Sequence, residues 1–224
     1  MLIIELIVDL LYSLLRLFSA YILSISVALV IGISMARSKV LEVILYPIID
    51  VLQSIPVLGF FPAVLLFLVN IFPPPIGVEM ASIILIFTGQ VWNLILGVYS
   101  AIKSLPSDFI LLSEVYSLNT ASRILKIYIP AALFAIASNS VVSWAGGLFF
   151  LTACEIISFG NTEYRLRGIG TTIIELASKG DYIDMYIAIM LLLAISIFLY
   201  IFLWNPLANI AANISGVVKL FTLQ

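Results

Sequence analysis

The sequence predicts an all-α fold: a polytopic membrane helical bundle of about five transmembrane helices, with a polar loop between the third and the fourth. Of its 224 residues, 63% are hydrophobic and only 10% are charged, whereas a soluble domain carries about 25% charged residues. The mean hydropathy is +1.25. Apolar runs near the length of about 20 residues that a bilayer requires recur along the chain. The composition therefore excludes a soluble globular protein.

The N-terminal part contains one clear span. Met1–Leu11 is apolar but carries Glu5 and Asp9, four residues apart and so on one helical face. This segment is too short to cross a bilayer alone, so it either extends the next helix or lies at the interface. We predict the first span at Leu15–Met35.

The second apolar block, Val40–Phe72, is too long for a plain span and contains three prolines. We predict an amphipathic helix to about Ser54, a break at Ile55–Pro56 and a spanning piece at Val57–Ile71. Broken backbone at membrane depth is tolerated where it is buried or lines a cavity, but a simple proline kink is the alternative. The first half carries polar residues at helical spacing: Glu42, Tyr46, Asp50 and Gln53.

The remaining spans follow from three further apolar runs. A turn is expected at Phe72–Gly77 and a polar loop at Gly160–Asp184. Because proline lacks a backbone N–H, Pro206 is expected to end the last span. The three predicted spans are Ala81–Ala101, one within Ile129–Phe159, and Met185–Trp204.

The polar stretch Ala101–Pro130 is the longest one expected in water. Ser107 and Asp108 after Pro106 predict a helix start, since acidic residues suit the first turn. Asn119 predicts a second start, and Pro130 begins or kinks the next apolar run. The apolar side chains of this stretch either mark a partner site or only cap the bundle: Phe109, Leu111, Leu112, Val115 and Leu118.

This stretch resembles the cytosolic motif E-A-A-x3-G-x9-I-x-L-P of binding-protein-dependent ABC importer permeases. Anchored on Pro130, the spacing fits without a gap: Ile127 and Ile129 match the tail and Ser117 takes the Gly position, whereas Leu111–Ser113 replace E-A-A. The resemblance implies a coupling helix that docks on an ATPase subunit. The implied coupling residues are Leu111, Leu112, Ser113, Glu114, Tyr116, Ser117, Leu118, Asn119 and Arg123.

Further pieces resemble the same family from about Tyr12 to Pro206. They are Tyr12–Arg16, Pro47 followed by Ser54–Pro56, and Trp144–Phe150 through Glu155. The Gly-Gly-x-Phe-Phe run and Gly168-Ile169-Gly170 are most similar to the anion branch, the nitrate, sulfonate and taurine permeases. We divide the chain into an N-terminal segment (1–11), a transmembrane permease domain (12–210, with the coupling loop at 102–128) and a C-terminal tail (211–224).

The resemblance implies a permease subunit of an ABC-type importer in the cell membrane. It would form half of a path for a small solute, an anion of the nitrate, sulfonate or taurine class. The implied partners are ABC ATPase subunits, a second permease subunit in a homo- or heterodimer, and an extracellular solute-binding protein. No cofactor is expected on this chain, because ATP and Mg would bind the ATPase.

The residues do not predict an enzyme, a metal site or a nucleic-acid partner. The chain has no histidine and one cysteine, and its net charge of −2 gives no basic face. Gly168-Ile169-Gly170-Thr171-Thr172 is similar to a phosphate loop, but the lysine is missing. We interpret these glycines as a loop turning into a short helix, with a phosphate or anion nest as the alternative.

Polar residues inside the spans are candidates for a transport path. The strongest is Glu155, because a carboxylate in hydrocarbon costs at least about 2.5 kcal/mol. It either lines a path or lies near the outer interface, hydrogen-bonded to loop backbone. Serine and asparagine also join helices by hydrogen bonds. The candidates are Gln90, Asn93, Asn139, Ser143, Trp144 and Glu155.

Cations near the span ends prefer the cytosol and predict the N-terminus outside and the C-terminus cytosolic. With the polar loop inside, the inner cations are Arg37, Lys39, Lys103, Arg123, Lys126 and Lys219, and the outer ones are Arg16, Arg165, Arg167 and Lys179. Two other classes stay open. One is a secondary transporter or channel without an ATPase, and the other is a membrane enzyme or assembly scaffold.

Overall fold

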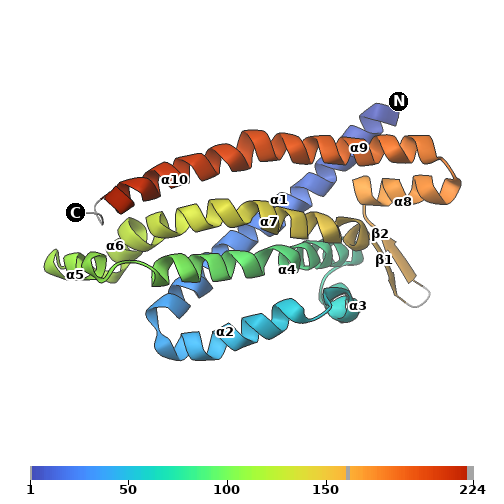
Figure 1. Ribbon diagram of the computed structural model, residues 1–224. Helices are drawn as coiled ribbons and strands as arrows, with labels where there is room; N and C mark the ends of the chain where they lie inside the picture. Colours follow the sequence, from blue (N-terminus) through green and yellow to red (C-terminus); the bar gives the residue numbers. More distant parts are fainter. Residues whose placement is uncertain (1, 160–161, 221–224) are drawn as a thin grey trace. The chain divides into compact units, whose positions relative to one another are not determined.

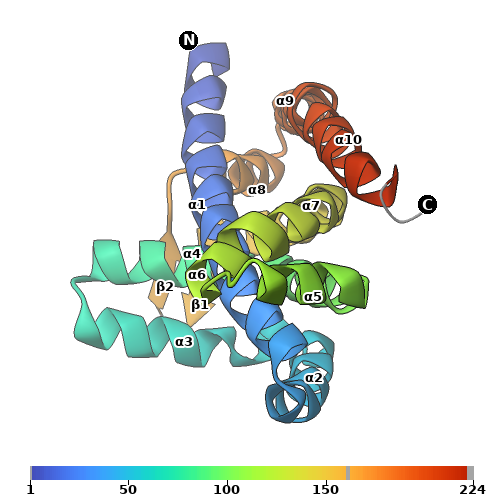
Figure 2. The same cartoon turned by 90° about the vertical axis from the view of Figure 1, so that its left-hand side faces the viewer.

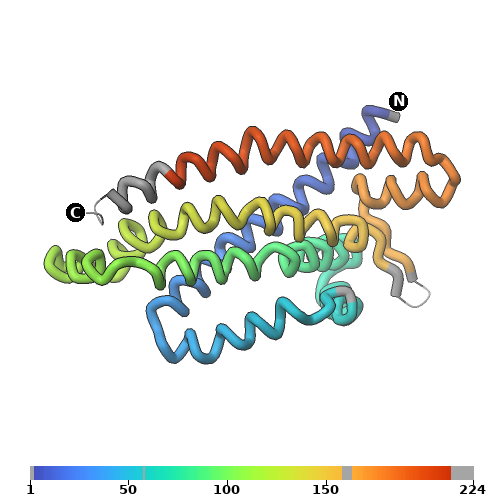
Figure 3. Tube along the Cα trace, in the orientation of Figure 1, coloured from blue at the N-terminus to red at the C-terminus, as the bar shows by residue number. Residues whose placement is uncertain are grey.

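The computed structural model describes residues 2–159 and 162–220 of the chain (Figures 1 and 3). The chain forms two compact units. Unit 1 consists of Met1–Leu23, Ser54–Gln90 and Trp144–Leu199, and unit 2 of Ser24–Gln53, Val91–Ser143 and Tyr200–Gln224. Both units are built almost entirely from apolar helices, as the composition predicts. Each unit is described by itself.

The first helix, α1 (Leu2–Arg37), includes the N-terminal apolar segment, so this segment extends the first predicted span. Helices α2 (Lys39–Ser54) and α3 (Val57–Ile71) follow, with the predicted break at Ile55–Pro56. Pro56 itself has an extended conformation, with φ −60° and ψ 103°. Ile55 comes directly before this proline, and a residue before proline avoids the helical region.

Helix α3 does not form a span by itself, which corrects the prediction for Val57–Ile71. Its 15 residues cover about 22 Å at 1.5 Å per residue, less than the hydrocarbon thickness of about 30 Å. It is long enough only together with α2, and this pair, bent by 101°, forms either one broken span or a re-entrant loop. The described part of the chain has four helices that are long and apolar enough to cross a membrane, or five with this pair.

Helix α4 (Pro74–Lys103) begins earlier than expected. Pro74 and Pro75 occupy its first turn, where the backbone N–H groups need no helical partner. The turn predicted at Phe72–Gly77 is therefore only Phe72–Pro73. The same rule that makes proline a helix breaker in the interior makes it a good first residue.

The polar loop forms a helical hairpin, α5 (Ser107–Val115) and α6 (Thr120–Arg123), which joins α4 to α7 in Figure 1. Both predicted helix starts are confirmed. A π-helical turn, η1 (Ile124–Tyr128), leads directly into α7 (Ile129–Glu155). Pro130 thus lies inside a continuous helical run. Proline has no backbone N–H to donate, and the wider π-helical turn before it accommodates the missing hydrogen bond.

Helix α7 ends at Glu155, four residues before the end of the run that predicted the fourth span. The next residues form strand β1 (Ile156–Phe159), which pairs antiparallel with β2 (Thr162–Arg165), with Ile156 opposite Arg165 (Figure 2). Helix α8 (Ile169–Lys179) follows, as the glycines at its start predict. The loop expected from Gly160 is thus largely structured, while Gly160 itself lies outside the described residues.

The last helical run continues beyond the predicted stop. Helix α9 (Tyr182–Leu199), the π-helical turn η2 (Tyr200–Trp204) and α10 (Asn205–Leu220) form one candidate span from Tyr182 to Ala212. Pro206 does not end it, and a π-helical turn again ends two residues before the proline. The predicted tail (211–224) begins inside α10, and residues 221–224 lie outside the described residues.

Glycines allow close helix contacts in both units. In unit 1, α4 and α7 cross where Gly89 meets Gly146, and a Cβ on Gly146 would collide with the Gly89 carbonyl oxygen. In unit 2, a Cβ on Gly32 would approach the Val98 side chain to 2.8 Å. Small residues let helix backbones approach in this way in membranes. Gly146 therefore allows close packing of α7 against α4.

Candidate functional site

A buried ion-pair cluster lies at the end of α7 in unit 1. Glu155 is the last residue of α7, and none of it is exposed. The Arg16 Nη1 donates to Glu155 Oε1 at 2.8 Å, and the Arg16 Nε donates to Glu79 Oε1 at 2.8 Å. The Arg16 side chain is 3% exposed. One guanidinium therefore pairs with two carboxylates and joins α1, α4 and α7.

The other oxygen of Glu155 occupies the N-terminus of α8. Gly170 N donates to Glu155 Oε2 at 2.7 Å, and Thr171 N donates to the same oxygen at 3.3 Å. Ser13 Oγ donates to Glu155 Oε1 and accepts from Ile169 N at 2.9 Å. Free N–H groups at a helix start attract negative charge. The Glu155 carboxylate thus supplies the negative charge at the N-terminus of α8.

The two glycines at the start of α8 leave room for this carboxylate. A Cβ on Gly168 would collide with the Glu155 carboxylate, and a Cβ on Gly170 would lie 2.8 Å from Glu155 Oε2. Gly168 is extended, with φ 176°, and Gly170 is not in the left-handed region, so it is space and not backbone conformation that requires glycine here. The sequence left open an anion nest at these glycines. In the structure, the Glu155 carboxylate of the chain itself occupies that position.

A second ion pair ties α1 to α8. Asp9 Oδ1 accepts from Arg167 Nε at 2.8 Å, and Asp9 Oδ2 accepts from Thr172 Oγ1 at 2.8 Å. The Arg167 guanidinium also lies over the Tyr12 ring, 5.4 Å from its centre. The hydrogen bond to Asp9 raises the pKa of Arg167 above its usual value. These contacts hold the loop before α8 against α1.

A groove of about 510 Å³ opens beside this cluster. It is lined by residues of α1, α4, β2 and the loop between β2 and α8: Tyr12, Arg16, Pro74, Pro75, Val78, Glu79 and Tyr164–Arg167. Its three arginines are all paired, Arg16 with Glu79 and Glu155, Arg165 with Glu163 and Glu175, and Arg167 with Asp9. The groove therefore offers no unpaired guanidinium to an external anion.

The α5–α6 hairpin in unit 2 exposes apolar side chains. Leu111, Leu112, Val115 and Tyr116 are between 52% and 78% exposed. Ser113, on the opposite side, is buried, and its Oγ donates to the Ile110 carbonyl at 2.6 Å. This short helix therefore presents a set of apolar groups that no described residue covers.

The turn after α5 is a Schellman motif. Ser117 N donates to the Glu114 carbonyl at 2.8 Å, and Leu118 N donates to the Ser113 carbonyl at 2.9 Å. Ser117 has φ 49°, in the left-handed region that favours glycine. This is the position where the motif of the resembled family has glycine, so the structure gives the physical reason for that glycine.

Asn119 and Arg123 close the hairpin. Ser122 N donates to Asn119 Oδ1 at 2.8 Å, which confirms the predicted cap of α6. Arg123 Nε donates to the Leu118 carbonyl at 3.2 Å, and its Nη1 lies 3.9 Å from Glu114. The polar residues of the predicted coupling set thus hold the turn, while Leu111, Leu112 and Tyr116 are exposed and Leu118 is half-buried.

The candidate path residues of unit 1 are all buried. Gln90 lies against Gly147, and neither atom of its amide has a hydrogen-bond partner among the described residues. Trp144 packs on Phe18, with ring centres 4.7 Å apart. Together with Glu155, these are the unit 1 members of the set, and their role in a path stays a prediction.

The remaining candidates belong to unit 2. Asn139 Nδ2 donates to the Ala135 carbonyl at 2.8 Å, and its amide lies against Gly97. Ser143 is buried and Asn93 is half-buried. The role of these residues in a path also stays a prediction.

Sequence reasoning did not place Ser13, Arg16 or Glu79 beside Glu155. Ser13 and Arg16 appeared only within the Tyr12–Arg16 motif, and Arg16 also as an outer cation. Ser13 and Arg16 lie three residues apart, which puts them on one face of α1. Two polar residues at that spacing in an apolar helix indicate a buried polar contact, and this was the signal available in the sequence. Glu79 carried no such signal, because its partner lies 63 residues away.

The long apolar helices define a multi-pass membrane protein. The model of the family "Binding-protein-dependent transport system inner membrane component" matches residues 28–211. The chain therefore belongs to this family, and the resemblance seen in the sequence is confirmed.

Three curated relatives show the range of this similarity. The bicarbonate transport system permease protein CmpB of Synechocystis sp. is 26% identical over 187 residues, 84% of this chain and 62% of that protein. The nitrate import permease protein NrtB of Synechococcus elongatus is 28% identical, over 56% of this chain and 42% of that protein. The glycine betaine transport system permease protein OpuAB of Bacillus subtilis is 31% identical, over 51% of this chain and 38% of that protein. The chain thus spans between 38% and 62% of the length of these relatives.

A solved structure shares the fold. A chain of the inward-facing MetNI methionine ABC transporter superposes with a TM-score of 0.73 and 16% sequence identity. The match covers 93% of this chain and 97% of that chain. At this identity the likeness speaks for the fold alone, and it supports the predicted membrane bundle.

Proposed function

We propose that this chain is the transmembrane permease subunit of an ABC-type importer and forms half of a translocation path for a small solute. The observation that carries the proposal is the α5–α6 hairpin, which sits between two membrane-crossing helices and exposes Leu111, Leu112, Val115 and Tyr116. In water, such an apolar patch on a polar hairpin marks a partner site. The family match supports an ATPase as that partner.

Docking on this surface has a simple energetic basis. Burying one leucine side chain completely contributes about 1.5–3 kcal/mol. Leu111 and Leu112 are 57% and 52% exposed, so a partner can still cover half of each. The Schellman turn and the Asn119 cap fix the shape of the hairpin before the partner binds, which lowers the entropy cost of association.

We propose a small anion as the solute, because two of the relatives are named as bicarbonate and nitrate permeases. The paired arginines of unit 1 do not favour a fixed cationic site for it. Selectivity would then come from amide and hydroxyl groups such as those of Gln90 and Ser143, and from a solute-binding protein that delivers the anion.

The complete transporter would contain two permease chains, either identical or related, and two ATPase subunits that carry ATP and Mg. With the hairpin in the cytosol, the N-terminus lies outside and the C-terminus inside. Transport follows alternating access, in which nucleotide and solute shift the population of two helix packings. No covalent step is needed on this chain.

Co-purification tests the proposal. The tagged chain is purified from its native cell, and an ATPase with a phosphate loop should elute with it. Leu111→Asp combined with Leu112→Asp should abolish this, because a partner would have to bury two charges. Asp108→Asn is the matched control on the same hairpin and should leave the ATPase bound. Unchanged transport without any bound ATPase would instead favour a secondary transporter or channel.

A further inference from the structure

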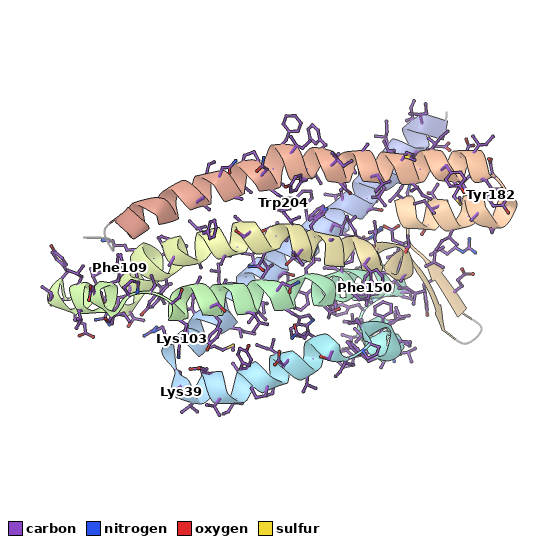
Figure 4. The ribbon with its side chains drawn as sticks, in the orientation of Figure 1. Lys39, Lys103, Phe109, Phe150, Tyr182 and Trp204 are labelled. Carbon is purple, nitrogen blue, oxygen red and sulfur yellow. The ribbon has the colours of Figure 1, made fainter. Side chains whose placement is uncertain are left out.

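A cluster around Glu42 joins α2 to α4 in unit 2. Glu42 Oε2 accepts from Lys103 Nζ at 2.6 Å, and Oε1 accepts from Tyr99 Oη at 2.9 Å and from Lys39 Nζ at 3.2 Å. Figure 4 labels Lys39 at the start of α2 and Lys103 at the end of α4. Three donors on two helices therefore converge on one carboxylate.

The surroundings make this contact more defined than a typical surface ion pair. The Glu42 side chain is only 14% exposed, although Lys103 is 45% exposed. Tyr99 and Lys103 are four residues apart and so lie on one face of α4. One turn further along α2, Tyr46 packs edge-on against Tyr99, with ring centres 5.8 Å apart. Two members of the polar stripe noted in the sequence of α2, Glu42 and Tyr46, thus have partners on α4.

The position of the cluster links it to the hairpin. Lys103 is the last residue of α4, and only Ser104, Leu105 and Pro106 separate it from α5. Proline fixes its own φ and restricts the residue before it, so this connection is short and stiff. A displacement of α5 therefore pulls first on the turn of α4 that holds Tyr99 and Lys103.

We propose that Glu42, Tyr99 and Lys103 are positioning residues for energy coupling: they transmit movement of the α5–α6 hairpin to α2. The inference rests on the proposed function, because it requires a partner that moves the hairpin. Without the cluster, the end of α4 can move while α2 stays in place. ATP hydrolysis then continues without the matching change in the helices.

The test uses the complete transporter, co-purified with its ATPase and reconstituted in liposomes. A cysteine at Gln53, at the far end of α2, carries a fluorescent label; the native Cys154 is buried. In the unmodified background, ATP with Mg should shift the label signal. Glu42→Gln and Tyr99→Phe should each reduce this shift about threefold or more, with ATPase binding and hydrolysis retained, since mutations in a coupling network weaken coupling without contacting the ligand.

Reversing the charges of Glu42 and Lys103 distinguishes a loss of coupling from a loss of folding. Glu42→Lys alone should lose the shift, and Glu42→Lys with Lys103→Glu should regain it. Glu163→Gln, which breaks an exposed ion pair in unit 1, is the control and should leave the shift unchanged. Lys39→Met should have a smaller effect than Lys103→Met, because Lys39 is 76% exposed and its bond is longer.

Two results would overturn the inference in different ways. If the ATPase co-purifies and the nucleotide-dependent shift is the same in Glu42→Gln, Tyr99→Phe and the unmodified transporter, the coupling role is wrong and the proposed function stands. If no ATPase co-purifies with the unmodified chain, the proposed function fails and the coupling role fails with it.

Discussion

The Glu155 carboxylate accepts a hydrogen bond from the Gly170 backbone N–H at 2.7 Å, so the end of α7 caps the start of α8. Arg16 and Ser13 bind the other carboxylate oxygen from α1. A fully buried charge is tolerated only when it is paired and hydrogen-bonded, and this one has both kinds of partner. The cluster therefore connects α1, α7 and α8 in unit 1, and its removal should lower the stability of the protein.

The two glycines of this cluster give the first prediction. Gly168→Ala should lower thermal stability in detergent, because its Cβ would collide with the Glu155 carboxylate. Overpacking of this kind costs about 1–3 kcal/mol. Gly59→Ala is the control, since a Cβ there meets nothing within 4 Å. In a Glu155→Ala background, Gly168→Ala should cost much less, and equal costs in both backgrounds would contradict the assignment.

Arg16 gives the second prediction. Removing one partner of a buried ion pair costs about 3–5 kcal/mol, because the other charge stays buried alone. Arg16→Met should therefore strongly lower the melting temperature of the purified chain. Adding Glu155→Gln removes the uncompensated charge and should recover part of the loss. If the double variant is no more stable than Arg16→Met alone, the Arg16–Glu155 pair does not determine stability here.

Much of the helix layout could be predicted from hydropathy and caps. The breaks at Ile55–Pro56 and Pro106 and the cap at Asn119 follow from local chemistry, which acts within a few residues. One error concerns proline: Pro206 was expected to end the last span, but the helix continues through it. Pro130 and Pro206 each lie two residues after a π-helical turn, and the helix continues through both. Whether a proline ends a helix depends on how the preceding turn widens, and no residue pattern in the sequence signals that.

The site was less predictable than the fold. Glu155 and the glycines at 168 and 170 stood out separately, but their contact joins residues 15 positions apart across a strand hairpin. The Ser13 contact to Glu155 spans 142 positions. Such pairings depend on tertiary packing, which local spacing does not encode. The apolar residues of the α5–α6 hairpin were easier to find, because a polar segment that carries exposed leucines is itself unusual.

Ser117 gives the third prediction. Its φ of 49° costs a non-glycine residue about 1–2 kcal/mol, and glycine adopts this conformation readily. Ser117→Gly should therefore slow hydrogen exchange at the Leu118 amide, which closes the Schellman turn. Ser117→Ala keeps the Cβ and should give no such protection. Faster exchange in Ser117→Gly than in the unmodified chain would show that the serine side chain itself stabilises the turn.

Asn119 gives the last prediction, because it is the only residue whose side chain caps a helix of the hairpin among the described caps. Its Oδ1 accepts from Ser122 N at 2.8 Å, and loss of such a cap typically costs about 1 kcal/mol. Asn119→Ala should speed exchange of the Ser122 amide about fivefold, whereas Asn119→Asp keeps an acceptor and should preserve protection. Since α6 runs directly into η1 and α7, the effect should fade along the helix toward Pro130. Equal exchange rates in the alanine and aspartate variants would mean that packing, and not the cap, starts this helix.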